Sequence, residues 1–246
     1  NFRMGAGLSY LTKKFEVPAN RRNQAIGSHL NGSMQFVLLY NHLMQRGYLE
    51  AGIGISHYSN AAFTMPNLGY NIPSIFLRYG RSIKPRTNSV TEFNPGSNYF
   101  NFTGFLIYGK KERNFANPQS FHNYGVQFRT LYSRNQVKYW RAGVDATVDK
   151  TYRFAKDPTY PLDSLKLNEK LEIGIAAGRQ WRMNRLSIYV ELGAYVYKPE
   201  VLKEPLYQRV GIGYSITEQL HTQGALKFHK GVADYFELGL GYRINK

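Results

Sequence analysis

Apolar and polar residues alternate along most of this chain with a period of two. In the segment 186–197 the even-numbered residues, from Leu186 to Val196, are all apolar, whereas the odd-numbered residues are Ser, Tyr, Glu and Gly. The segment 235–244 repeats the pattern. Because successive side chains of a β-strand point to opposite faces, this period predicts strands with one apolar and one polar face.

The alternation recurs throughout the sequence and predicts an all-β chain with about twelve strands or more. The predicted strands are residues 2–14, 33–43, 46–58, 71–83, 99–110, 121–134, 136–149, 169–181, 185–198, 206–217, 218–229 and 233–245. Their connections alternate between short turns and long loops, apart from 84–98 and 230–232. Such alternation is typical of outer-membrane barrels.

The polar face of these strands is rich in Gly, Tyr, Arg and Glu, which suits the crowded interior of a barrel whose apolar face meets lipid. The predicted fold is therefore an antiparallel, up-and-down transmembrane β-barrel, a single domain over residues 1–246 in a Gram-negative outer membrane. Further strands before Asn1 are compatible with this interpretation. A helical membrane protein is excluded, because no segment approaches the ~18 apolar residues of a spanning helix.

The composition excludes several kinds of site. The 246 residues contain no Cys, so disulfides, thiolate metal sites and a catalytic cysteine are ruled out. The histidines show no ligand spacing, and neither a metal nor a cofactor is expected. Lys and Arg number 32 against 16 acidic residues, a net charge of +16. Many of these cations lie near the long loops rather than along one groove or helix, which favours lipopolysaccharide phosphates over nucleic acid as their partner.

The third predicted strand, 46–58, and the loop after it carry the candidate chemistry. Residues two apart in a strand point the same way, so His57 and Ser59 share the face of Ile53 and Ile55. This is the apolar, lipid-facing side, where polar groups are expensive and often functional. An imidazole beside a hydroxyl can remove its proton and create a nucleophile for acyl transfer.

These residues belong to a longer motif. The string His-Tyr-Ser-Asn-Ala at 57–61 is followed by Pro-Asn-Leu-Gly at 66–69. Together they resemble the lipid A deacylases, the PagL-like outer-membrane acyl hydrolases, and the resemblance is strongest over residues 52–80. The segment 27–31 is also similar to the one that precedes the motif in longer members of the family from the Bacteroidetes.

The resemblance implies an esterase that removes an ester-linked acyl chain from lipid A in the outer leaflet. Carried over by position, Ser59 is the nucleophile and His57 is the general base. Asn60 and Asn67 then hold the ester carbonyl and its oxyanion. The family implies an acid that orients the imidazole, and Asn71 stands at that position. Its amide oxygen can accept an imidazole N–H but carries no charge, and the Asp-to-Asn change in a serine-protease triad lowers turnover about 10⁴-fold.

The Asn at position 71 leaves a second interpretation open. The chain is then a catalytically weak or inactive barrel that serves as a structural subunit of an envelope complex, with protein partners in that complex. The extra strands favour this interpretation, because the well-known members of the family are eight-stranded. A third interpretation is a pore, which needs a wide lumen, whereas many Tyr, Arg and Glu side chains are predicted to face inward.

Overall fold

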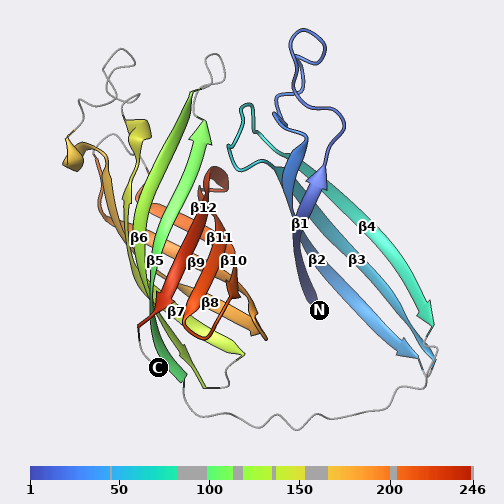
Figure 1. Ribbon diagram of the computed structural model, residues 1–246. Helices are drawn as coiled ribbons and strands as arrows, with labels where there is room; N and C mark the ends of the chain where they lie inside the picture. Colours follow the sequence, from blue (N-terminus) through green and yellow to red (C-terminus); the bar gives the residue numbers. More distant parts are fainter. Residues whose placement is uncertain are drawn as a thin grey trace. The chain divides into compact units, whose positions relative to one another are not determined.

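The computed structural model describes residues 1–44, 46–81, 99–112, 119–134, 137–152, 166–199 and 204–244. These residues form two compact units, one within Asn1–Phe93 and the other within Asn94–Lys246. Both units consist of antiparallel β-strands, and the described residues of the second also include the single-turn 3-10 helices η1 (Lys150–Tyr152) and η3 (Leu167–Glu169) (Figure 1). In this described part of the chain, no helix has the length and apolar character needed to cross a bilayer.

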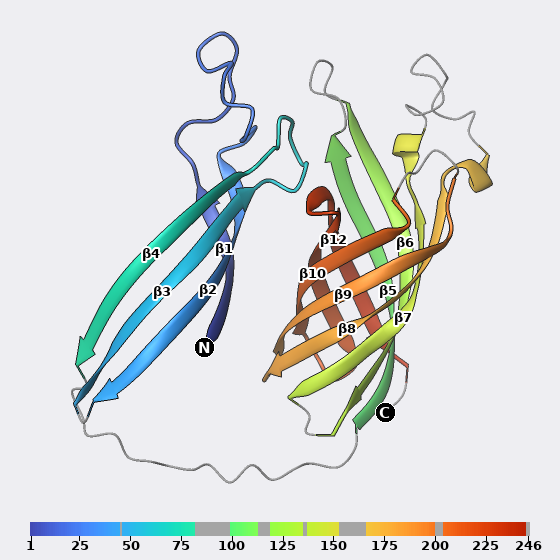
Figure 2. The same cartoon turned by 180° about the vertical axis from the view of Figure 1, so that it is seen from behind.

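The first unit is an open sheet of four strands in sequential order (Figure 2). Its strands are β1 (Phe2–Tyr10), β2 (Leu30–Met44), β3 (Gly47–Ser59) and β4 (Tyr70–Arg81). One face carries mostly apolar side chains, and Ile53 and Ile75, which are opposite each other in β3 and β4, are both exposed there. On the other face Glu50 forms ion pairs with Arg3 and Arg78, each at 3.1 Å. The sheet therefore divides its residues between two faces as the period-two pattern predicts.

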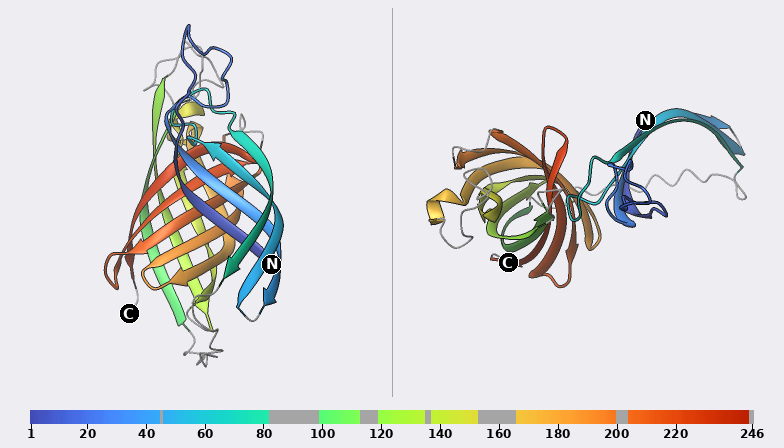
Figure 3. Two further views of the ribbon diagram at one scale, coloured as in Figure 1. Left: turned by 90° about the vertical axis from the view of Figure 1, so that its right-hand side faces the viewer. Right: turned by 90° about the horizontal axis from the view of Figure 1, so that it is seen from above.

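The second unit is a closed barrel of eight strands, which is seen end-on in the right-hand view of Figure 3. Its strands are β5 (Tyr99–Glu112), β6 (Ser120–Ser133), β7 (Lys138–Val148), β8 (Leu171–Met183), β9 (Leu186–Tyr197), β10 (Leu206–Ser215), β11 (Leu220–His229) and β12 (Val232–Arg243). Strand β12 pairs with β5 from Phe236 opposite Lys110 to Arg243 opposite Thr103, and this pairing closes the sheet.

The structure confirms the predicted strands and corrects how they close. All twelve strands are present close to their predicted bounds, and every strand pair is antiparallel. They form an eight-stranded barrel and a separate four-stranded sheet, so the prediction of one closed sheet of twelve strands is wrong. The physical reason is that β5 hydrogen-bonds to β6 on one side and to β12 on the other, which leaves no edge for β4. The predicted connection 84–98 lies outside the described residues, and a single outer-membrane domain over 1–246 stays a prediction.

Charged side chains that neutralise one another fill the middle of the barrel. This mid-barrel cluster consists of three guanidinium groups and three carboxylates, Arg129, Arg141, Arg209, Asp145, Glu191 and Glu237. Glu191 alone accepts hydrogen bonds from Arg129 at 2.8 Å, Arg141 at 2.6 Å and Arg209 at 2.8 Å. Inward-facing Arg and Glu side chains were predicted, and their mutual pairing leaves this lumen filled rather than open.

Candidate active site

The predicted active-site residues lie at one end of the apolar face of the open sheet. His57 and Ser59 are the last two residues of β3 on that face, and Asn71 is directly opposite His57 in β4. The same face continues along β3 with the exposed side chains of Ile55 and Ile53. Ser59, the last residue of β3, is only 7% exposed. Local strand pairing thus gathers three polar side chains at the end of an apolar stripe.

A hydrogen bond joins the imidazole of His57 to the side chain of Asn71. Nδ1 of His57 lies 2.7 Å from Oδ1 of Asn71, and because a carbonyl oxygen only accepts, Nδ1 is the donor. The neutral ring then carries its proton on Nδ1, and Nε2 is left as an acceptor. The amide of Asn71 therefore fixes the tautomer that a general base requires, without supplying a charge.

The hydroxyl of Ser59 is close along the strand but is not joined to the imidazole. Within the described residues it makes no hydrogen bond, although Ser59 and His57 are two positions apart on one face. A serine–histidine hydrogen bond is often long in an enzyme without substrate and shortens when substrate binds. The structure brings His57 and Asn71 into contact, and within the described residues it leaves the buried Ser59 hydroxyl without a hydrogen-bond partner.

In the loop that follows β3, both predicted oxyanion residues, Asn60 and Asn67, make hydrogen bonds within the loop. The Asn60 side chain donates to the carbonyl oxygen of Thr64 at 2.8 Å, and the Asn60 backbone N–H donates to Oδ1 of Asn67 at 2.8 Å. Ala61 and Ala62 both have positive φ, 57° and 59°, a conformation that is strained for residues with a Cβ and that clusters at functional sites. In the described part of the chain the N–H groups of these two alanines and Nδ2 of Asn67 donate no hydrogen bond. Within the described residues these three donors are therefore unpaired.

Two glycines for which the sequence predicts no role allow this loop to pack closely against its neighbours. A Cβ on Gly69, where φ is +77°, would lie 2.7 Å from Cε1 and 3.4 Å from Nε2 of the His57 ring. A Cβ on Gly27 would lie 2.8 Å from the carbonyl oxygens of Thr64 and Pro66. Both glycines occur in the strings that carry the family resemblance, which was the available signal. Their role depends on contacts between segments, which the sequence pattern does not give.

The connection between β1 and β2 supports the same loop. The backbone N–H of Gly69 donates to the carbonyl oxygen of Ala25 at 2.9 Å, and the hydroxyl of Tyr70 donates to Asn23 at 2.8 Å. This contact places the segment 11–29, with its cations Lys13, Lys14, Arg21 and Arg22, in the same unit as the site.

An apolar groove begins beside the polar residues and crosses all four strands of the sheet. Its volume is about 760 Å³, and its lining includes Phe2, Phe36, Ile55 and Pro73. Ile55 and Pro73 are opposite each other, one strand period from the His57–Asn71 pair. His57 and Asn71 therefore lie at the end of an apolar surface.

Two other features are separate from this site. Glu50 lies on the opposite face of the sheet with its two arginine partners, so it does not orient His57. Among the described residues, no group of three or more His, Asp or Glu side chains is arranged to hold a metal ion.

Comparison with known protein families agrees with the division into two units. The family described as lipid A 3-O-deacylase matches residues 1–80, which hold the open sheet and the candidate site. The family described as acyloxyacyl hydrolase, C-terminal domain, matches residues 98–246, which hold the barrel. These matches place the chain among the hydrolases. The chain belongs to the PagL family of lipid A 3-O-deacylases, with the acyloxyacyl hydrolase C-terminal domain as its second part. No curated protein matches the sequence.

Proposed function

We propose that this chain is an outer-membrane esterase that removes an ester-linked acyl chain from lipid A by a Ser/His mechanism. The observation that carries the proposal is the 2.7 Å hydrogen bond between His57 and Asn71 on the apolar face, beside Ser59. An oriented imidazole with a free Nε2 contributes little to packing on a lipid-facing surface. It is suited to activating a hydroxyl for acyl transfer.

In this mechanism Oγ of Ser59 attacks the ester carbonyl carbon while Nε2 of His57 takes the hydroxyl proton. The tetrahedral intermediate then expels the alcohol oxygen of lipid A, which receives that proton from His57. A water molecule, deprotonated by the same imidazole, hydrolyses the acyl-serine and releases the fatty acid. Asn71 keeps the ring oriented through both half-reactions but gives the imidazolium no charge, so turnover is expected to be slow.

The oxyanion of the intermediate needs hydrogen-bond donors near Ser59. We assign this role to Nδ2 of Asn67 and to the backbone N–H groups of Ala61 and Ala62, which are free of other hydrogen bonds within the described residues. Asn60 supports them indirectly, because its side chain and backbone hold the loop closed.

The substrate reaches the site from the side, within the outer leaflet. The apolar groove accepts the acyl chains, and the cations of segment 11–29 meet the phosphates of lipopolysaccharide. In a bilayer the outer edges of β1 and β4 require partner strands, because unpaired backbone groups are not tolerated in lipid.

The test compares the parent chain with Ser59→Ala and Ser56→Ala, each incubated with lipid A and read by mass spectrometry for acyl loss. Ser56 is a matched control, since it lies in the same strand on the opposite face, where it accepts a hydrogen bond from Gln35 at 3.3 Å. We expect the parent and Ser56→Ala to release one acyl chain, and Ser59→Ala to release none while remaining folded.

Retained acyl loss in Ser59→Ala would contradict the nucleophile assignment. No acyl loss from the parent would favour the second candidate, a structural subunit of an envelope complex. One observation supports that candidate, namely that Asn71 occupies the position of the orienting acid and gives the imidazole only a neutral partner.

A further inference from the structure

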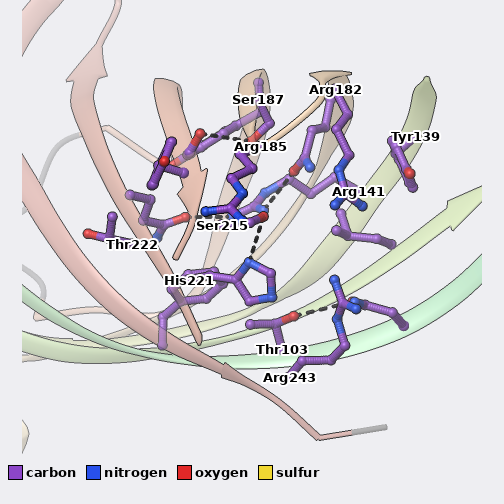
Figure 4. Close-up of a pocket in the computed structure, with 18 of the residues that line it drawn as sticks. Thr103, Tyr139, Arg141, Arg182, Arg185, Ser187, Ser215, His221, Thr222 and Arg243 are labelled. Carbon is purple, nitrogen blue, oxygen red and sulfur yellow. Dashed lines mark hydrogen bonds between the residues drawn. The ribbon is translucent and has the colours of Figure 1, made fainter. Parts of the chain in front are cut away.

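A small cavity lies inside the barrel at the end where short turns join β8 to β9 and β10 to β11. Its volume is about 40 Å³. Figure 4 shows the side chains of Arg182, Arg185, Arg243 and His221 converging on it from several strands and turns. By the volume that one buried water occupies, such a cavity has room for about three waters, which is the size of one small anion. We call it the turn-end cavity.

The turn-end cavity carries an excess of positive charge. Four arginines line it, and no Asp or Glu does. Arg141 is neutralised by Glu191 at 2.6 Å in the mid-barrel cluster. Within the described residues Arg182, Arg185 and Arg243 form no ion pair: Arg182 donates to the carbonyl oxygen of Asn184 at 2.9 Å, and Arg243 lies over the ring of Tyr99 at 5.7 Å. Three guanidinium charges are therefore left without a counter-charge.

Polar atoms buried at this cavity also lack partners. Nε2 of His221, Nε of Arg243 and the hydroxyl of Tyr189, a residue only 1% exposed, make no hydrogen bond in the described part of the chain. Buried polar groups in native proteins rarely stay unpaired, so an unexplained set of them points to a bound water or ion. His221 is held in place from its other nitrogen, Nδ1, which lies 3.1 Å from Oγ of Ser215.

We propose that the turn-end cavity binds a phosphate group. Guanidinium groups present forked N–H donors that match the oxygens of phosphate, and a charge of +3 suits a dianion better than chloride. The cavity admits one phosphoryl group, which comes either from free inorganic phosphate or from a phosphomonoester whose remainder extends out past Arg185 at the turn. This site lies in the barrel and is independent of the esterase chemistry proposed for the open sheet.

The test is calorimetric titration of the folded full chain in detergent micelles with inorganic phosphate, at an ionic strength held constant with chloride. We expect saturable binding with one site, and a thermal unfolding midpoint that rises with phosphate concentration. Arg243→Gln should weaken binding at least tenfold. Arg185→Gln, at an exposed turn position, should weaken it by a smaller factor.

The matched control is Arg179→Gln, which removes the same charge from β8 on its outer face, where Arg179 stacks over Trp140 at 4.1 Å. Its phosphate affinity should equal that of the parent. Titration with glycerol phosphate distinguishes the two sources: binding of inorganic phosphate alone indicates the free ion, and tighter binding of the ester indicates a headgroup. If neither probe binds, or if the parent, Arg185→Gln and Arg243→Gln bind phosphate with equal affinity, the proposal is overturned.

Discussion

The two units of this chain place polar side chains in opposite ways. In the barrel every strand is paired on both sides, and the residues of the mid-barrel cluster point inward and neutralise one another. Within the described residues of the open sheet, β1 and β4 have no partner strand on their outer sides, and three polar residues, His57, Ser59 and Asn71, gather at one end of a mostly apolar face whose other end carries His42. The mid-barrel cluster keeps its charges inside the barrel, whereas the sheet gathers three polar side chains on its apolar face. His57, Ser59 and Asn71 are therefore the residues to test for catalysis, whereas the mid-barrel cluster is the set to test for stability.

The largest expected effect is the loss of acyl release when the proposed general base, His57, is replaced. His57→Gln keeps a polar side chain but cannot take a proton from Ser59, so acyl release should fall about 10⁴-fold, with no change in unfolding. The measurement is the rate of fatty-acid release from lipid A. The control is His42→Gln, because His42 is on the same face at the other end of the sheet, opposite Leu49. Equal rates of fatty-acid release in the two variants would show that His57 is not the general base.

The next effect concerns stability in the barrel. Glu191→Gln leaves three buried arginines with two carboxylates, and breaking a buried charge network from one side costs about 3–5 kcal/mol of unfolding free energy. Denaturant unfolding of the chain in micelles measures this. Glu50→Gln in the sheet is the comparison, because its partners Arg3 and Arg78 are 50% and 53% exposed. It should cost only about 1 kcal/mol, since exposed partners are solvated when the carboxylate is lost. A similar cost in both units would mean that the barrel interior is hydrated.

The sequence predicts which face of a strand each residue occupies, but it does not predict which distant strands pair with each other. A period of two determines which side of a strand each residue occupies, so the twelve strands, the outward apolar stripe and the sharing of one face by His57 and Asn71 could all be predicted. Closure depends on β5 meeting β12, two segments far apart in sequence whose alternation is no different from that of β4. No periodicity carries that information.

In the candidate site, too, the sequence predicts contacts between paired strands better than contacts within a loop. The hydrogen bond from His57 to Asn71 follows from strand parity and residue type. An oxyanion role for Asn60 stays a prediction, and what the sequence does not show is that its side chain also closes the loop onto Thr64. Asn and Asp side chains readily bond nearby backbone, so an Asn in a loop motif has a local alternative that the motif itself does not reveal.

A smaller effect tests whether Asn71 limits the reaction. Asn71→Asp restores a carboxylate beside the imidazole and should raise the rate of acyl release about 10- to 100-fold, less than the full effect in a protease triad because the site faces lipid. Asn71→Leu removes the acceptor and should lower the rate by a similar factor. Identical rates in the parent and both variants would show that Asn71 does not orient His57.

The smallest expected effect separates backbone strain from contact with the imidazole. Gly69→Ala and Gly231→Ala both place a Cβ at positive φ, +77° and +82°, so each should cost about 1–2 kcal/mol of stability. A Cβ at Gly231 meets nothing within 4 Å, whereas at Gly69 it meets the ring of His57 at 2.7 Å. Only Gly69→Ala should therefore lower the rate of acyl release, by about tenfold, because a shifted ring misaligns Nε2 with Ser59. If both variants lose the same stability and neither loses rate, then Gly69 serves the turn alone and the imidazole tolerates displacement.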